Sequence, residues 1–331
     1  MRAFVTTAYK GPLRQAEVAE PAIGESDVLV GVHAAGVNKL DEMIRVGAFK
    51  RILPHSLPLI LGHDLAGIAI RVGRNVHSFK PGDEVYARAN NSQIGTFAER
   101  IAVAESDLAR KPSSISMEEA GSLPLVALTA WQALVERGHV EPGQKILIHG
   151  GAGGFGSVAI QLARHLGATV ATTASASNHD FVRELGADIA IDYRTQDFEQ
   201  ILSGYDLVID TIGGENLEKS LRVLKRGGKA IALVGPPDPA FAREVGLGPA
   251  LRLAIAGLSA GIRRKARRLG VKYEFLFVRA DGEQLREISA LVDNGALRPI
   301  VGRVFPFDRA AQALESTAKG GIRGKTVVSI P

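Results

Sequence analysis

The stretch KILIHGGAGGFG, residues 145 to 156, is an apolar run that ends in a cluster of glycines, and SVAIQLARHLG follows it directly. Gly151, Gly153 and Gly156 have the spacing G-x-G-x-x-G. In that spacing the first glycine permits a tight turn, the second lets the backbone approach a pyrophosphate, and the third lets a helix pack on a strand. The pattern predicts a dinucleotide-binding strand, turn and helix, whose N-terminus faces the phosphates. The alternative is a glycine-rich turn that binds no ligand.

The same order of apolar strand, glycine-bearing turn and amphipathic helix repeats from Leu123 onward. Such alternation is typical of a parallel sheet with helices on both faces. Six strands with intervening helices predict a doubly wound domain over residues 123–278. The expected strands are 145–150, 169–174, 189–193, 206–212, 229–235 and 273–278.

The flanking parts of the chain have a different texture. Residues 1–122 contain short alternating strands, such as 27–37 and 65–73, separated by Gly, Pro, Asn and Asp, which favours a compact β-barrel. After Arg279 we expect a helix, a strand, a second helix and a final strand, GKTVVSI (324–330), that returns to the first domain. The prediction is an α/β protein with a β-barrel domain formed by 1–122 and 279–331.

Composition excludes several classes of protein. With 46% hydrophobic and 23% charged residues the chain is globular, and the absence of cysteine excludes disulfides, thiolate nucleophiles and cysteine-built zinc sites. The N-terminal residues lack the order of a secretory signal, so we expect a cytoplasmic protein. The apolar run 245–262 contains Arg252 and is too short for a membrane span, so we expect a buried helix or the wall of a pocket.

The residues after the second predicted strand bear on the choice of nucleotide. An NAD site usually has an acid about 20 residues beyond the glycines, where it holds the ribose 2′-hydroxyl. Here the strand is followed by Ser175 and Asn178, and Tyr193 and Arg194 end the next strand. The absence of an acid favours NADPH over NADH. The alternative is that these polar residues only cap the next helix.

These stretches, taken in order, resemble the zinc-free quinone oxidoreductase branch of the medium-chain dehydrogenase/reductase superfamily, which includes enone and alkenal reductases. The resemblance implies a GroES-like β-barrel with a Rossmann domain inserted before the last segment. It covers almost the whole chain and rests on AAGVNKLDEMIRVGAF (34–49), PLILGHDLAGIAIRVG (58–73), FKPGDEVYA (79–87), GTFAERIAV (95–103), SLPLVALTAWQAL (122–134), GGAGGFGSVAIQLARHLGA (150–168), LGADIAIDY (185–193) and RGKTVVSI (323–330).

The resemblance also implies roles for single positions. Asn38 stands where the zinc enzymes of the superfamily have a cysteine, and Gly62-His63-Asp64 is similar to their Gly-His-Glu, so we expect no metal. Asn178 stands where relatives commonly carry a lysine for the 2′-phosphate. The residues implied to contact the cofactor, together with those of the glycine turn, are Asn38, Thr129, Gly154, Phe155, Val234, Phe277, Val278 and Lys325.

Without a metal the protein lacks a Lewis acid, and no tyrosine is followed by lysine four positions later. The substrate should therefore be activated already: a quinone or an α,β-unsaturated carbonyl compound, which accepts hydride from a nicotinamide because the charge moves onto oxygen. No catalytic group is identified, and Asn38 and Asp41 are the only candidates. The predicted pocket is lined by Met43, Arg45, Phe49, Tyr86 and part of 247–262, although Asp41 and Arg45 have the spacing of a helical ion pair.

A basic run, Arg263 to Arg268, raises a rival interpretation of RNA binding. Aromatic residues make up only 5% of the chain, too few for a base-stacking surface, so we interpret the run as a solvated helix end and expect no nucleic-acid partner. The alternative function is an RNA-binding or cofactor-sensing protein with little turnover. The resemblance implies a homodimer through edge strands, for which 229–235 and 273–278 are candidates.

Overall fold

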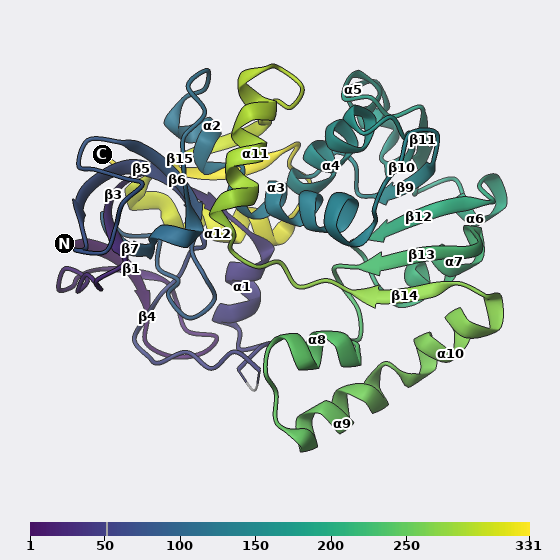
Figure 1. Cartoon of the computed structure of the whole chain (residues 1–331), viewed down its shortest axis with the longest axis horizontal. Coiled ribbons are helices and arrows are strands. Elements are labelled where there is room, and N and C mark those ends of the chain that lie inside the picture. The colour runs from purple at the N-terminus through teal and green to yellow at the C-terminus, as the bar shows by residue number, and fades with distance from the viewer. Residues whose placement is uncertain (51) are drawn as a thin grey trace. The chain divides into compact units, whose positions relative to one another are not determined.

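The computed structural model describes residues 1–50 and 52–331, which form two compact units (Figure 1). Unit 1 comprises Met1–Leu128 and Arg279–Pro331, and unit 2 comprises Thr129–Val278. The first boundary lies inside helix α3 (Pro124–Trp131), where the sequence placed it at 122/123. Unit 1 is the GroES-like β-domain and unit 2 the Rossmann domain that the sequence predicts.

Unit 2 is built on a parallel six-stranded sheet in the order β11-β10-β9-β12-β13-β14. The chain moves outward from β9 in both directions, first to β10 and β11 and then to β12, β13 and β14. In such sheets ligands bind outside the carboxyl ends of the strands, where the order reverses. The strands are β9 (Lys145–His149), β10 (Thr169–Ala174), β11 (Ile189–Asp192), β12 (Tyr205–Asp210), β13 (Leu224–Ala232) and β14 (Lys272–Phe275).

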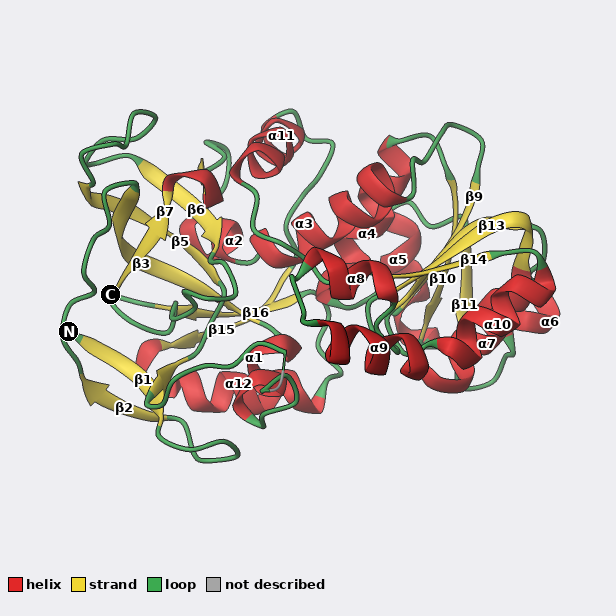
Figure 2. Ribbon diagram, turned by 60° about the horizontal axis from the view of Figure 1, so that its bottom comes forward, coloured by secondary structure: helices red, strands yellow, loops and turns green. Residues whose placement is uncertain are grey.

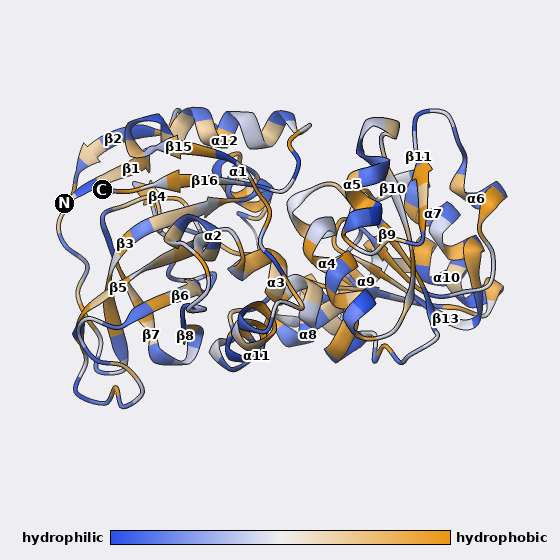
Figure 3. Ribbon diagram, turned by 90° about the horizontal axis from the view of Figure 1, so that it is seen from above, coloured by the Kyte–Doolittle hydropathy of each residue, from blue (hydrophilic) through white to orange (hydrophobic). Residues whose placement is uncertain are grey.

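Helices cover both faces of this sheet, which explains why its central strands are continuous apolar runs (Figure 2). Ile146, Leu147 and Ile148 of β9 are completely buried, and the apolar residues of the strands can be followed in orange in Figure 3. The helices of unit 2 are α4 (Gly154–His165), α5 (His179–Glu184), α6 (Phe198–Ile201), α7 (Gly214–Val223), α8 (Pro239–Glu244), α9 (Pro249–Leu258) and α10 (Ala260–Leu269), with the short helices η2 (Gln132–Arg137) and η3 (Ala176–Asn178).

Two predictions for unit 2 are wrong. The stretch 229–235 is not an edge strand, because β13 pairs with β12 on one side and β14 on the other. The run 245–262 is not a buried helix, because α9 has Ile255 as its only buried residue. No helix of residues 1–50 and 52–331 is long and apolar enough to cross a membrane.

Unit 1 contains a seven-stranded sheet and a smaller three-stranded sheet, β2-β1-β4. The large sheet has the order β15-β16-β3-β5-β6-β8, with β7 also paired to β3. Its strands are β1 (Arg2–Thr6), β2 (Arg14–Glu17), β3 (Asp27–Val37), β4 (Leu59–Ile60), β5 (Asp64–Val72), β6 (Glu84–Arg88), β7 (Arg100–Ala104), β8 (Leu108–Arg110), β15 (Val301–Pro306) and β16 (Lys325–Ser329). Its helices are α1 (Lys39–Arg45), α2 (Met117–Gly121), α11 (Gly282–Asp293) and α12 (Ala310–Lys319), with the short helices η1 (Glu105–Asp107) and η4 (Phe307–Arg309).

The C-terminal segment completes unit 1. Strand β16 pairs antiparallel with β3, with Thr326 opposite Val37 and Ser329 opposite Ala34. The predicted return of the last strand to the first domain is therefore confirmed. The segment brings Lys325 beside the end of β3 and the start of α1, which matters for the site below.

Tyr86 connects the two segments of unit 1. It is fully buried, its hydroxyl donates to the Leu285 carbonyl oxygen at 2.6 Å, and it accepts a hydrogen bond from the Ser289 hydroxyl at 2.9 Å. Burial also raises the pKa of Tyr86 above its usual range. The prediction that Tyr86 lines a substrate pocket is wrong, because its side chain anchors α11 to β6.

We expect Tyr86→Phe to lower the free energy of unfolding by about 1–2 kcal/mol, because it removes two buried hydrogen bonds. Its kcat/KM should equal that of the wild type. The matched control is Tyr193→Phe, on a side chain that is 57% exposed, which should change stability by less than about 0.5 kcal/mol. Urea unfolding of both variants measures the difference, and equal stability would contradict the anchoring role of Tyr86.

Candidate functional site

The glycine turn between β9 and α4 is shaped by one positive-φ glycine, one close backbone approach and one open position. Gly150, at φ +72°, makes the turn. A Cβ atom on Gly156 would lie only 2.6 Å from the Gly151 Cα, whereas on Gly153 its nearest neighbour would be the Gly150 carbonyl oxygen at 3.4 Å. Thus Gly156 is required for packing, while Gly153 presents an open face at the N-cap of α4. A pyrophosphate fits this open face and the helix N-terminus behind it.

Side chains from the neighbouring strands hold the turn. Thr173 of β10 accepts a hydrogen bond from the Gly150 amide at 3.1 Å. His149 contacts the Thr173 hydroxyl at 3.1 Å and the Ser220 hydroxyl at 3.0 Å, and burial lowers the pKa of His149 to about 4. At neutral pH the imidazole is therefore uncharged and serves as a fixed link between β9, β10 and α7.

Asp210, at the carboxyl end of β12, orders the next loop in the same way. Its carboxylate accepts hydrogen bonds from the Ile212 and Gly213 amides at 2.9 and 2.6 Å and from the Asn216 amide at 2.8 Å. The sequence analysis missed this residue. The sequence did contain a signal for it. In DLVIDTIGG (206–214), Asp210 ends an apolar strand and is followed closely by two glycines, which indicates an aspartate that orders a turn.

The residues predicted to hold the 2′-phosphate gather at the ends of β10 and β11. Asn178 donates to the Ser175 hydroxyl at 3.0 Å, so the residues after β10 form a neutral polar turn. Asp192, opposite Ala174 in the sheet, directs its carboxylate into its own turn, where it accepts from the Arg194 amide at 3.1 Å. The Arg194 guanidinium lies 5.7 Å from the centre of the exposed Tyr193 ring.

The remaining predicted cofactor residues of unit 2 follow β13, β14 and α3. Val234 is partly exposed beyond β13, and Val278 is buried beyond β14. The Phe277 ring lies 5.8 Å from the Phe241 ring. Thr129 is buried in α3. Because all strands are parallel, Val234, Phe277, Ser175 and the glycine turn share the carboxyl edge of one sheet.

In unit 1 the predicted residues Asn38 and Lys325 belong to a buried network centred on Asp64. One carboxylate oxygen of Asp64 accepts from the Leu125 amide at 2.7 Å, and the other accepts from the Asn38 side chain at 2.9 Å. The Lys325 ammonium group lies 3.2 Å from this second oxygen and also donates to the Asn38 side-chain oxygen and, at 3.2 Å, to the Val37 carbonyl. The lysine therefore supplies the positive charge that the buried carboxylate needs.

Asp41 and His63 form a second buried pair beside it. The Asp41 carboxylate contacts His63 Nδ1 at 2.6 Å and accepts from the Asn38 backbone amide at 2.8 Å. Arg88 is also fully buried, and burial lowers the pKa of its guanidinium to about 10, which leaves it charged at neutral pH. The Asp41 side chain is fully buried, and both of its carboxylate oxygens are engaged at the start of α1.

The residues of and after α1 that were predicted to line a substrate pocket differ in their surroundings. The Arg45 guanidinium pairs with the Glu42 carboxylate through two contacts of 2.7 Å, so the predicted pairing of Arg45 with Asp41 is wrong. Met43 is partly exposed on α1, and Phe49 packs against the core of unit 1. The sequence assigned these residues by proximity along the chain, which does not determine where side chains point.

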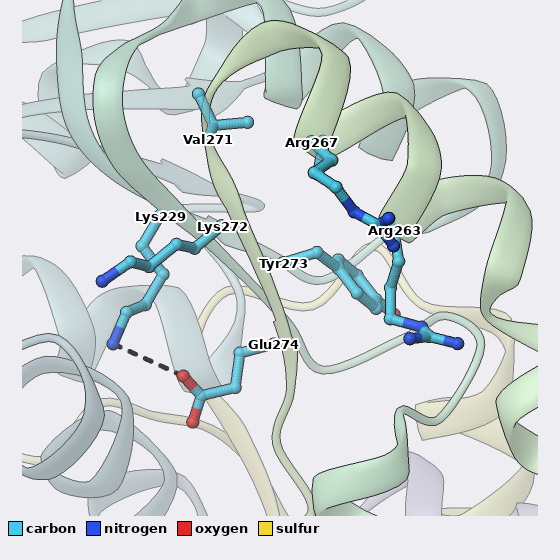
Figure 4. Close-up of a pocket in the computed structure, with 8 residues that line it drawn as sticks. Lys229, Arg263, Arg267, Val271, Lys272, Tyr273 and Glu274 are labelled. Carbon is cyan, nitrogen blue, oxygen red and sulfur yellow. Dashed lines mark ion pairs between the residues drawn. The ribbon is translucent and has the colours of Figure 1, made fainter.

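A hollow lies elsewhere in unit 2, beside α10 and β14 (Figure 4). Its volume is about 470 Å³, and none of the predicted site residues lines it. Arg263 and Arg267 line it from α10. Lys272 of β14 and Lys229 of β13 line it as well, and the Lys229 ammonium group pairs with Glu274 at 3.4 Å. In the described part of the chain no three His, Asp or Glu side chains are placed to hold a metal ion.

Two family models match the chain. The alcohol dehydrogenase GroES-like domain matches residues 24–113, and the zinc-binding dehydrogenase model matches residues 185–328. The chain is 37% identical over 328 residues to the NAD(P)H oxidoreductase RTN4IP1, mitochondrial, of Danio rerio, which covers 92% of the chain and 84% of that relative. It is 36% identical to the NADPH-dependent alkenal/one oxidoreductase, chloroplastic, of Arabidopsis thaliana, over 99% of the chain and 79% of the relative.

A solved structure is similar over the full length. The quinone oxidoreductase from Coxiella burnetii superposes with a TM-score of 0.87 at 30% identity, covering 100% of this chain and 99% of that one. The similarity therefore extends through both units and includes the glycine turn and the C-terminal return.

We expect Gly153→Ala and Gly156→Ala to separate binding from folding. Gly156→Ala forces a Cβ against backbone atoms and should destabilise unit 2 by about 1–3 kcal/mol. Gly153→Ala should fold with the wild-type melting temperature but bind NADPH more weakly, because its methyl group occupies the face open to a pyrophosphate. Thermal melts and NADPH fluorescence titrations measure the two effects, and wild-type affinity in Gly153→Ala would count against a phosphate site at this turn.

Lys325→Met should lower the free energy of unfolding by about 3–5 kcal/mol, because it leaves the Asp64 carboxylate buried without its cation. Adding Asp64→Asn should restore part of the loss, since the buried charge is then gone. As a surface control, Arg222→Met breaks a pair with Glu199 and should cost less than about 1 kcal/mol. Unfolding in guanidinium chloride, followed by circular dichroism, measures these free energies. Equal losses for Lys325→Met and Arg222→Met would contradict the prediction.

Proposed function

The chain belongs to the quinone oxidoreductase and alkenal/enone reductase branch of the medium-chain dehydrogenase/reductase superfamily, and on this premise we propose that it uses NADPH to reduce quinones or α,β-unsaturated carbonyl compounds without a catalytic metal. Membership makes it an oxidoreductase with a nicotinamide cofactor. The preference for NADPH, the class of acceptor and the independence from metal are the substance of the proposal.

The observation that carries the proposal is the turn before α4. Gly153 presents an open backbone face at the N-terminus of a 12-residue helix, where partial positive charge attracts the pyrophosphate. When bound, the cofactor supplies the hydride, and the chain supplies binding and orientation. His149 and Asp210 keep the two adjoining loops in a fixed conformation, so the turn needs no rearrangement to accept phosphates.

Arg194 supports the preference for NADPH. In the described structure the residues that directly follow β10, 175–178, carry no carboxylate, and the Asp192 carboxylate at the end of β11 is engaged in its own turn. Arg194 follows the strand next to β10 and offers the charge that a 2′-phosphate would pair with. The Arabidopsis relative is named as NADPH-dependent.

The Asp64 network supports metal independence. In the resembled zinc enzymes this region supplies ligands, but here Asn38 donates its amide hydrogen to Asp64 and Lys325 holds both of them. A divalent cation at these atoms would stand beside an ammonium group, which its charge disfavours. The residues present therefore do not fit a catalytic zinc ion, and no step of the proposed reaction uses one.

The proposed acceptor class rests on the chemistry of the residues present. Asp41, Tyr86 and Lys325 are buried and engaged, so none of them offers a proton to a substrate. A simple ketone needs its oxygen polarised as hydride arrives, whereas a quinone or enone delocalises the charge itself. The final proton would then come from solvent. The homodimer and the cytoplasmic location stay predictions, and of the two strands considered for the dimer only β14 lies at an edge.

We expect metal-stripped protein to oxidise NADPH in the presence of a small panel of quinones and enones, with a lower KM for NADPH than for NADH. Arg194→Ala should raise the KM for NADPH about tenfold or more through loss of a charge-assisted bond, and leave that for NADH unchanged. Arg183→Ala, an exposed arginine on α5, is the matched control and should change neither value.

Three results would contradict the proposal in different ways. Activity that returns only with added zinc would overturn metal independence. Equal effects of Arg194→Ala on both nucleotides would remove the role of Arg194. Tight NADPH binding without turnover of any acceptor would favour the cofactor-sensing alternative over the reductase.

A further inference from the structure

The segment between β13 and β14 has an unusual charge distribution. From Val245 to Tyr273 the chain has no acidic residue, and it has seven basic ones: Arg252, Arg263, Arg264, Lys265, Arg267, Arg268 and Lys272. This segment forms α9 and α10, which follow one another along the outside of β14 (Figure 1). A surface with one sign of charge attracts partners of the opposite sign.

Helix α9 exposes apolar side chains that its neighbours do not cover. Leu253 is 76% exposed and Leu258 is 68% exposed, whereas Ile255 is the only buried residue of the helix. Leu251 is partly exposed as well. Single exposed leucines are common on soluble proteins, but several on one helix indicate a contact surface.

Helix α10 places its basic residues on the outside. Its apolar residues Ile262 and Ala266 pack into the core of unit 2 with residues of α7 and β12. Lys265 pairs with Glu218. For Arg264, Arg267 and Arg268 the described structure shows neither an ion pair nor a hydrogen-bond acceptor, so their charges are available to a partner.

We propose that α9 and α10 dock this protein on the surface of an anionic lipid bilayer. An exposed leucine-bearing helix inserts into the boundary between headgroups and acyl chains, while adjacent arginines bind the headgroup phosphates. In this arrangement α9 supplies the apolar contact through Leu253 and Leu258, and α10 supplies the charge. The inference is separate from cofactor binding, since neither helix contributes a predicted cofactor residue.

The hollow beside α10 adds a place for a phosphate group. Arg263 and Arg267 approach it from the helix, and Lys272 and Lys229 lie on its other side (Figure 4). Glu274 is the one acidic residue among those that line it, and it pairs with Lys229. The excess of positive charge suits an anionic headgroup.

Two other occupants fit less well. A nucleic acid would use the arginines, but it would leave the exposed leucines without a role, and Tyr273 is the only aromatic residue from 245 to 273 for stacking a base. In a symmetric contact of two copies through α10, arginines would face arginines, which like-charge repulsion disfavours. The combination of leucine and arginine favours a lipid surface.

Co-sedimentation with vesicles tests the proposal. Wild-type protein should bind vesicles of equal parts phosphatidylcholine and phosphatidylglycerol, and its affinity should fall as the salt concentration rises. It should not bind vesicles of phosphatidylcholine alone. Arg264→Glu/Arg268→Glu should weaken binding at least about 30-fold. Leu253→Ser/Leu258→Ser should weaken it about tenfold or more, because two apolar side chains no longer insert. Both pairs are exposed, so wild-type melting temperatures are expected.

The matched control is Arg14→Glu/Arg309→Glu, which makes the same change in net charge at exposed positions of unit 1 and should bind as the wild type does. Equal weakening by this control would overturn the proposal, since net charge alone would then explain binding. Binding of a single-stranded RNA that depends on the arginines but not on the leucines, without vesicle binding, would assign the surface to nucleic acid. A dimer that Leu253→Ser/Leu258→Ser converts to monomer, again without vesicle binding, would assign it to a second copy.

Discussion

One buried carboxylate organises unit 1. Asp64 binds the backbone amide of Leu125, the side chain of Asn38 and the ammonium group of Lys325, which come from three separate parts of the sequence. A buried charge is stable only when its partners are all in place, so the network forms only when β16 has returned to β3 and α3 has reached the sheet. The same network lies at the start of α1 and places the Lys325 ammonium group beside Asn38 and Asp64.

Unit 2 depends on a constraint of another kind, the close approach of backbone atoms at the glycine turn. Gly156 brings α4 against β9 so closely that no side chain fits, and the N-terminus of α4 is thereby fixed at the carboxyl edge of the sheet. His149 and Asp210 fix the adjoining strands and loop. His149 contacts the hydroxyls of Thr173 and Ser220, and the Asp210 carboxylate accepts from the backbone amides of Ile212 and Gly213.

Much of this arrangement could be predicted from the sequence, and the failures have a common cause. The strands of unit 2, the inserted domain and the return of the C-terminal strand follow from local patterns and from order along the chain. The contacts of Asp41, Tyr86 and Arg45 in unit 1 could not be predicted in the same way. Asp41 and Tyr86 bind residues that are distant in the sequence, and Arg45 had more than one acidic residue at helical spacing. Spacing suggested Asp41 with Arg45, but His63 and Glu42 are the actual partners. The roles of the cofactor residues in unit 2 stay predictions.

The run 245–262 shows why apolar composition alone does not indicate burial. In α10 the apolar residues occur at helical spacing, with Ile262 and Ala266 four apart, so they reach the core and leave the arginines outside. In α9 the apolar residues occur on several sides, and only one side can face α8. Leu253 and Leu258 therefore stay exposed, although they are apolar, because they lie on sides of α9 that no neighbouring helix covers. Exposed apolar side chains are unfavourable in water unless a partner covers them, and a partner that is both apolar and anionic would contact the leucines of α9 and the arginines of α10 at once.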